Sequence, residues 1–292
     1  MDGIPLGENY TWSAARARGV TRSQIRADGV PIARGLYVSR SAELDLGARC
    51  RAWSHVLPRD ASFGLGTAAV LLGAGSTAST RLDVVVPPRQ VVPQRSGIAV
   101  HVRSLAEEDV VDISGLRVTS GAQTFLDLAA GLSPSDLVAL GDALMRGGRL
   151  EHAGLRRRLA RADRVRGVVR ARAWAPHLTA GAGSHPESTL RYWLLVSDLP
   201  EPELQVPILD RWGGEVVHAD LGYPRWKVAV EYEGRQHAER DQFGRDVGRY
   251  SLMAADGWLT LRFAARHLGG PHAVVGRTRR ALESRGWRPG TS

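Results

Sequence analysis

The chain has 292 residues, 43% of them apolar and 24% charged, which excludes a disordered polypeptide and leaves room for two or three domains. Thirty-eight arginines and one lysine against 30 acidic residues give a formal net charge of +9. This charge favours a polyanionic partner such as nucleic acid, although an arginine bias also reflects genome composition. The single cysteine excludes an internal disulfide, and the lack of a signal-like N-terminus or a run of roughly 20 apolar residues predicts a cytoplasmic protein with no membrane partner.

The N-terminal region predicts two short helices joined by a tight turn. Thr11 and Gly19 are residue types that begin and end a helix, and a second helix is expected from Thr21 to Asp28. A β-rich segment over 32–38 follows, and Gly35 permits a bend within it. The second helix is expected to expose side chains that can donate to phosphates and base edges in a major groove: Arg22, Ser23, Gln24 and Arg26.

This order of elements, over about residues 8–40, resembles the small winged-helix domain at the front of abortive-infection type antitoxins. The resemblance implies DNA binding and a protein partner of the toxin type. Two short helices with a glycine turn are also common as plain packing elements, so packing without DNA contact is the alternative. Little sequence precedes Thr11, so the usual first helix is expected to be shortened or absent, and we expect the domain to lean on its neighbour.

The middle of the chain alternates helical stretches with apolar runs, which predicts a small α/β domain. The expected elements are a helix around 67–73, strands at 82–86 and 98–102, and two helices beyond residue 119. The run from Val118 to Ala129, with Asp142 in the following helix, resembles the second domain of the same antitoxin-like proteins. His101 and Asp127 could pair, but an aspartate on such a helix more often caps it or joins a salt bridge. The expected role of this domain is to space the two ends of the chain.

A basic stretch follows. Residues 151–173 hold eight arginines and two acids, interleaved with apolar residues at helical spacing. A solvated linker helix and a phosphate-contacting surface are both open interpretations. The segment Gly181 to Ser184 then predicts a flexible boundary.

Carboxylates gather at the ends of two predicted strands near the C-terminus. Glu231 and Glu233 follow the apolar run 228–230 and lie on one side of a strand, roughly 7 Å apart. If the preceding hairpin pairs residues whose numbers sum to 451, Asp220 lies opposite Glu231. The pattern predicts that Asp220, Glu231 and Glu233 hold Mg²⁺ or Mn²⁺; an ordinary solvated strand end is the alternative.

These residues, with Gly234, His237, Asp246, Arg249 and Gly257-Trp258, resemble an endonuclease-like domain of unknown function related to very-short-patch repair endonucleases, in the PD-(D/E)xK superfamily. The resemblance covers about residues 184–285. It implies a restriction-endonuclease-like mixed sheet flanked by helices and a metal-dependent nuclease core. The third position of the acidic-x-Lys signature is Glu233 here, and related sequences usually have Asp there.

Four further residues have assigned or competing roles. Lys227 lies about 13 Å along the strand from Glu231, too far to replace the signature lysine. His237 is predicted as a catalytic residue, by acting as a general base, a phosphate contact or a ligand, and a loop-capping histidine is the alternative. Glu187 is predicted to support the metal site, or to cap its own helix. Arg249 is predicted to touch a phosphate, or to form an ion pair with Asp246.

The sequence thus predicts an α/β (α+β) chain with four parts. They are a winged helix (1–47), an antitoxin-like middle α/β domain (48–148), a basic helical linker (149–183) and an endonuclease-like domain (184–292). The predicted function is a DNA-binding, metal-dependent endonuclease. The alternative is a non-catalytic, antitoxin-like transcriptional regulator that uses the nuclease-like fold as a binding surface, and a scaffold without DNA affinity is the third.

Overall fold

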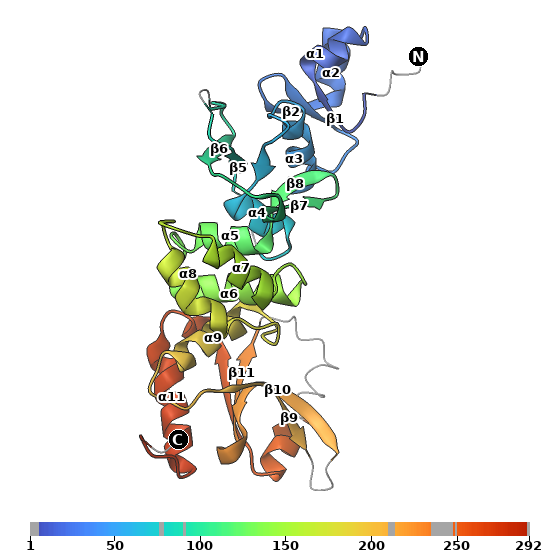
Figure 1. Cartoon of the computed structure of the whole chain (residues 1–292). Coiled ribbons are helices and arrows are strands. Elements are labelled where there is room, and N and C mark those ends of the chain that lie inside the picture. The colour runs from blue at the N-terminus through green and yellow to red at the C-terminus, as the bar shows by residue number, and fades with distance from the viewer. Residues whose placement is uncertain are drawn as a thin grey trace. The chain divides into compact units, whose positions relative to one another are not determined.

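A computed structural model describes residues 6–75, 79–89, 92–209, 214–234, 248 and 250–290, with the side chains of 215 and 216 excepted. The fold is α+β, as predicted, with three sheets among the described residues (Figure 1). The chain divides into two compact units. Unit 1 comprises residues 1–131 and 149–173, and unit 2 comprises 132–148 and 174–292.

The N-terminal part of unit 1 has the predicted helix-turn-helix and β-hairpin. Its elements are β1 (Asn9–Thr11), α1 (Trp12–Ala17), α2 (Arg22–Asp28), β2 (Gly29–Ala33) and β3 (Leu36–Ser39), in an antiparallel sheet ordered β1-β3-β2. The Thr11 side chain caps α1, and Thr21 and Gln24 form a capping box at the start of α2. Gly35 has a φ of +74°, the left-handed conformation that the hairpin bend requires.

The domain has a small core of its own. Tyr10, Ala15, Val20 and Ile25 are buried together, with Tyr37 packed against them. The strand β1 directly precedes α1, in the place where a first helix would otherwise lie. Helix α3 (Leu46–Ser54) then contacts both β1 and β3, so the winged-helix region packs against the segment that follows it.

The second sheet of unit 1 is mixed and five-stranded, with the order β6-β5-β4-β8-β7. Its strands are β4 (Ser62–Phe63), β5 (Leu82–Val86), β6 (Ile98–Val102), β7 (Val110–Ile113) and β8 (Leu116–Thr119). Helix α4 (Leu65–Leu71) packs on β5 and on α5 (Gly121–Leu128). Cys50 of α3 is fully buried, and burial raises the pKa of its thiol to about 12, so the thiol stays protonated at neutral pH.

The basic stretch 151–173 lies in unit 1 and contributes buried residues to it. It forms α7 (His152–Ala160), which packs on α5, and α8 (Val168–Trp174). Arg158 is buried, with its Nε donating to Gln123 Oε1 at 2.6 Å, and Arg161 forms two hydrogen bonds to buried Asp109. Burial alone would raise the pKa of Asp109, but these bonds and the charge of Arg158 hold it below its usual range.

Helix α6 (Pro134–Arg146) belongs to unit 2, although its sequence lies within the antitoxin-like region. It packs along α9 (His185–Leu195), and the two helices share a buried ion pair between Asp142 and Arg191. The divisions between the two compact units fall after residues 131, 148 and 173.

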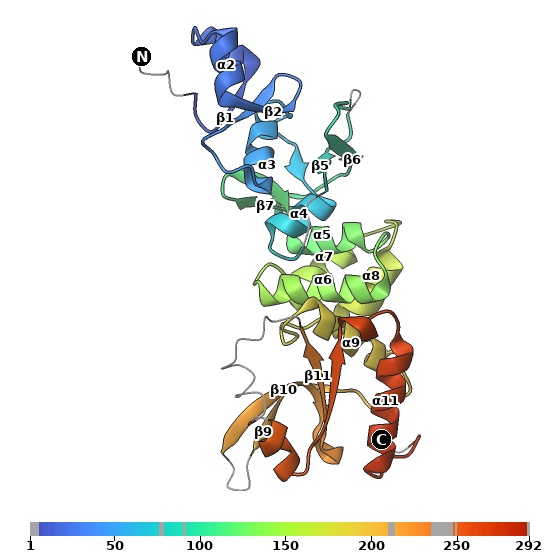
Figure 2. The same ribbon diagram turned by 180° about the vertical axis from the view of Figure 1, so that it is seen from behind.

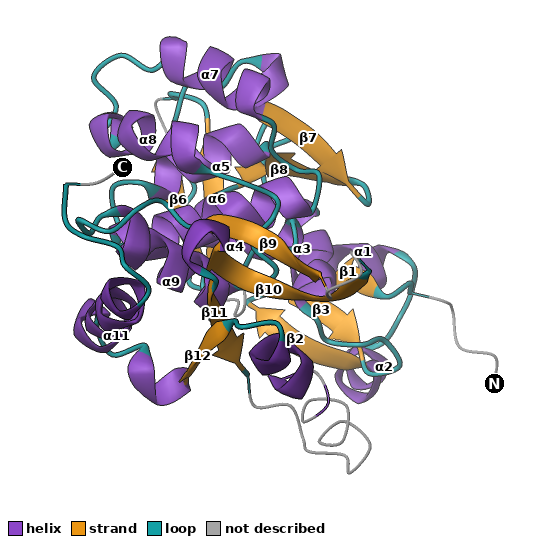
Figure 3. Cartoon of the chain, turned by 90° about the horizontal axis from the view of Figure 1, so that it is seen from below, coloured by secondary structure: helices purple, strands orange, loops and turns teal. Residues whose placement is uncertain are grey.

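Unit 2 is built on a mixed four-stranded sheet with the order β12-β11-β10-β9. The strands are β9 (Glu203–Leu209), β10 (Glu215–Tyr223), β11 (Val228–Glu233) and β12 (Leu259–Ala264), and β11 and β12 are parallel. One apolar cluster joins the sheet to α9 and α11 (Pro271–Ser284), and another joins it to helical residues 250–255. Figure 3 shows helices on either side of this sheet, as the sequence predicted.

Candidate functional sites

The first candidate site is the exposed face of α2. Arg22, Ser23 and Arg26 are exposed there, as predicted. Gln24 is exposed too, but its Oε1 accepts from both the Thr21 amide and the Thr21 hydroxyl at 2.8 Å, so part of its side chain serves the helix start. The Arg22 guanidinium lies 6.0 Å from the centre of the Trp12 ring, within the range of a cation–π contact.

The surface around α2 is strongly basic. Residues 12–40 contain six arginines and one acid, Asp28. The Asp28 carboxylate is turned inward: it accepts from the Tyr10 hydroxyl at 2.7 Å and from the Ser39 hydroxyl at 2.9 Å. Burial, together with the hydrogen bond from its hydroxyl to Asp28, holds the pKa of Tyr10 above its usual value. Arg34 is exposed at the turn of the β2–β3 hairpin, so the basic surface extends from α2 to the wing.

The second candidate site lies where β10 separates from β11. Leu221↔Val230, Gly222↔Ala229 and Tyr223↔Val228 are partners, so the predicted register, with sums of 451, is confirmed. The next pair in that register would be Asp220 and Glu231. At this position the contact between the strands is made by a side chain, because Asp220 Oδ2 accepts the backbone N–H of Tyr232 at 2.9 Å. Asp220 is therefore held against the strand that carries both glutamates.

The two glutamates of β11 have partners from other elements. Glu231 is only 4% exposed, and its Oε2 accepts from the Tyr250 hydroxyl at 2.9 Å. Glu233 is exposed and pairs with Arg262 of β12 at 2.7 Å. The Arg262 guanidinium stacks 4.1 Å from the centre of the Tyr250 ring, which links the two contacts. Neither Tyr250 nor Arg262 was predicted from the sequence, although a charged residue within the mainly apolar segment 259–263 was a signal.

The donor chemistry suits Mg²⁺, but the described geometry does not by itself make the predicted metal centre. Within the ranges that the structure describes, no three His, Cys, Asp or Glu side chains are grouped so that they could hold a metal ion. Each of Asp220, Glu231 and Glu233 also takes part in a hydrogen bond or an ion pair within the protein. The remaining predicted residues of this region, His237, Asp246 and Arg249, lie outside the described residues.

Glu187 caps the helix that contains it. Its carboxylate accepts from the Gly183 amide at 2.7 Å and from the Ser184 hydroxyl at 2.8 Å, the alternative that the sequence left open. Lys227 lies at the far end of β11, where its Nζ donates to the Asp256 carbonyl at 2.9 Å. His101 contacts Asp83 at 2.9 Å, while Asp127 accepts from Arg103 and Gln123, so the imagined His101–Asp127 pair does not form.

The chain is an α+β protein in which a helix-turn-helix with a β-hairpin precedes an α/β region. Residues 61–176 match the model of the AbiEi antitoxin C-terminal domain, which supports the predicted antitoxin-like region. The endonuclease-like resemblance of residues 184–285 stays a prediction.

Two curated relatives come from strains of Mycobacterium tuberculosis and are called uncharacterized proteins MT2308 and Rv2248. Each is 31% identical over 225 residues, which cover 77% of this chain and 81% of the relative. The chain belongs to the protein family that contains these two relatives. Among the described residues, no helix is both long enough and apolar enough to cross a bilayer.

Proposed function

We propose that this protein is a DNA-binding transcriptional regulator of the antitoxin type that acts in the cytoplasm, with a toxin as its protein partner. The observation that carries the DNA-binding proposal is the charge of the winged-helix region, where six arginines share the surface with one acid whose carboxylate is satisfied internally. Phosphate contacts from exposed arginines supply most sequence-independent DNA affinity. The match to an antitoxin domain over 61–176 supports the regulatory role and the toxin partner.

We expect Arg22→Ala combined with Arg26→Ala to weaken DNA binding at least about tenfold and to lower the salt slope by about one for each phosphate that is no longer neutralised. The reason is that both guanidinium groups are exposed on one face of α2. Fluorescence anisotropy with a DNA duplex over a range of KCl concentrations measures both quantities. Arg164→Ala is the matched control, since that side chain is 95% exposed in unit 1. Equal loss in the control, or no loss in the double variant, contradicts the proposal.

A metal-dependent endonuclease in unit 2 is the second candidate function. It is favoured by the confirmed register, which brings Asp220 beside β11 with Glu231 almost fully buried at the end of a central strand. A buried carboxylate in such a place needs compensating groups, and the Tyr250 hydroxyl is one of them.

If unit 2 is a nuclease, Glu231→Ala abolishes cleavage and leaves DNA binding by the winged helix unchanged. Supercoiled, linear, nicked and single-stranded DNA are incubated with Mg²⁺ or Mn²⁺, with a chelator and Glu231→Ala as controls for contaminating nuclease. Calorimetry of Mg²⁺ binding to the wild-type protein and to Glu231→Ala gives a second readout. Absence of both cleavage and Glu231-dependent metal binding removes this candidate and leaves the regulator.

A further inference from the structure

The C-terminal part of unit 2 has an excess of positive charge that neither candidate function uses. Residues 262–288 contain seven arginines and one acid. Arg262 pairs with Glu233 and Arg279 with Asp198. The exposed arginines on η4 (Ala265–His267) and along α11 are Arg266, Arg277 and Arg280. In Figure 2, α11 runs along the flank of the unit 2 sheet.

Within this surface, the His267 ring is fixed by its neighbours. Its Nδ1 accepts the backbone N–H of Ala264 at 2.9 Å, and the ring stands edge-on to buried Phe263 with the ring centres 5.7 Å apart. A neutral imidazole that uses Nδ1 as an acceptor carries its proton on Nε2. His267 therefore presents an N–H donor in a set direction, away from β12.

That donor meets a second donor. His267 Nε2 lies 3.3 Å from Nη1 of Arg277, whose guanidinium is always protonated. Two N–H groups cannot satisfy each other, and in the described part of the chain no hydrogen bond gives either of them an oxygen acceptor. Arg280 lies three residues further, on the same face of α11, and like charges at this spacing repel. An oxyanion at this place would accept from both donors and relieve the repulsion.

We propose that His267 and Arg277, with Arg280 beside them, bind a phosphate group of the DNA backbone. The inference rests on the proposed DNA-binding function and adds a contact surface on unit 2 to the winged helix of unit 1. Arginine and imidazole N–H groups are common phosphate donors, and charge-assisted bonds of this kind are stronger than neutral ones. Inorganic phosphate has the same chemistry, so the test has one arm for each source.

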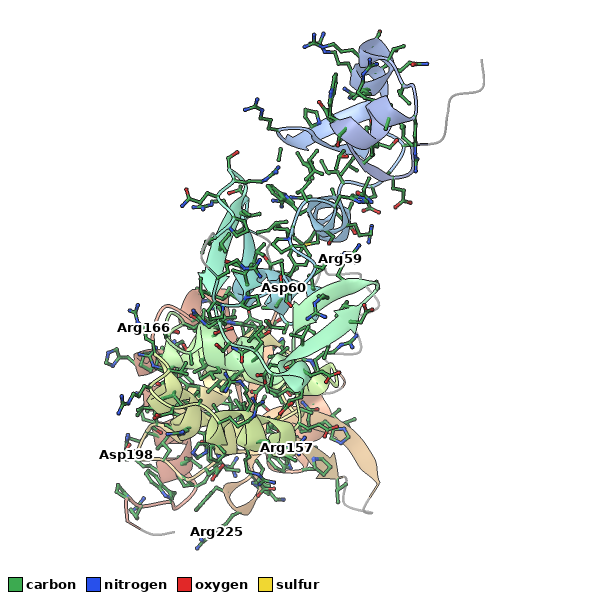
Figure 4. The ribbon with its side chains drawn as sticks, turned by 45° about the horizontal axis from the view of Figure 1, so that its top comes forward. Arg59, Asp60, Arg157, Arg166, Asp198 and Arg225 are labelled. Atoms are coloured by element: carbon green, nitrogen blue, oxygen red, sulfur yellow. The ribbon has the colours of Figure 1, made fainter. Side chains whose placement is uncertain are left out.

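The test uses the full chain with three single substitutions. Arg277→Gln removes the charge. His267→Asn keeps an acceptor for the Ala264 amide but loses the Nε2 donor. Arg225→Gln is the matched control, because Arg225 is exposed on a unit 2 turn and points away from the body of the protein (Figure 4). Anisotropy with a mixed-sequence duplex is measured across KCl concentrations, and calorimetry measures inorganic phosphate. Thermal unfolding confirms that each variant is folded.

We expect Arg277→Gln to weaken duplex binding roughly fivefold and to lower the salt slope by about 0.9, with a smaller loss for His267→Asn and none for Arg225→Gln. Duplex binding that needs Arg22 and Arg26 but not Arg277 overturns this inference and leaves the proposed function standing. Absence of salt-sensitive duplex binding by the wild-type protein overturns both. Arg277-dependent binding of inorganic phosphate, with duplex affinity unchanged in Arg277→Gln, overturns the assignment to the DNA backbone.

Discussion

Asp142→Ala is expected to destabilise unit 2 by about 3–5 kcal/mol, the usual cost of removing one partner from a buried ion pair. Asp142 is fully buried on α6, and its carboxylate accepts from Arg191 at 2.9 and 3.0 Å, from the Ser188 hydroxyl at 2.8 Å and from the Thr179 amide at 2.8 Å. Truncation leaves a buried guanidinium and two further donors without an acceptor. Urea unfolding of the full chain, followed by tryptophan fluorescence and circular dichroism, measures the change.

Asp136→Ala is the matched control on the same helix. Its carboxylate contacts His185 at 3.3 Å and is about half exposed, so we expect a loss below about 1 kcal/mol. Replacing both Asp142 and Arg191 by leucine and methionine should cost less than Asp142→Ala alone, because no uncompensated charge then remains. If Asp142→Ala unfolds within about 1 kcal/mol of the wild type, the buried ion pair is not what holds α6 to α9.

Gly121→Ala is expected to destabilise unit 1 by roughly 2–3 kcal/mol. Helix propensity alone predicts the opposite sign, since alanine in a helix is favoured over glycine by up to about 1 kcal/mol. Sterics decide here, because a Cβ at Gly121 would lie 2.1 Å from the Arg149 carbonyl oxygen and 2.9 Å from its carbon. Both atoms belong to backbone that cannot turn aside as a flexible side chain would. The midpoint and slope of chemical unfolding report the effect.

Gly154→Ala tests the same substitution where space is available. The nearest atom to a Cβ there is Arg157 Nη2, 3.9 Å away, so helix α7 should gain about 0.5–1 kcal/mol. Opposite signs for the two variants are the expected pattern. A stabilising Gly121→Ala would show that the segment before α7 does not press against the start of α5.

The elements that sequence patterns predicted correctly are those set by neighbours in the chain. Thr11 and Thr21 cap helices through bonds to residues three positions on, and the β10–β11 register follows from its short turn. The β7–β8 hairpin was missed, although Ser114 and Gly115 both have positive φ, a conformation that a Ser-Gly pair suits.

What could not be predicted depends on residues far apart in sequence. Nothing near Asp142 indicates Arg191, 49 positions away, as its partner. Arginines at helical spacing in the basic stretch suggested a solvated face, but Arg158 and Arg161 meet Asp109 about 50 residues earlier. The carboxylates of β11 were placed correctly along the strand, while their partners Tyr250 and Arg262 come from elements whose packing no local pattern specifies.

The division of the chain into two discontinuous units limits which fragments of the protein can fold. The backbone passes between the two units three times, near residues 131, 148 and 173, so no single cut separates them. A fragment that begins at residue 184 would leave out α6 and strip one side of α9, where Arg191 and Ser188 would lose their only described carboxylate. Deletion, fusion and two-hybrid experiments on this family therefore need the intact chain. Any cut between residues 131 and 173 leaves part of one unit attached to the other.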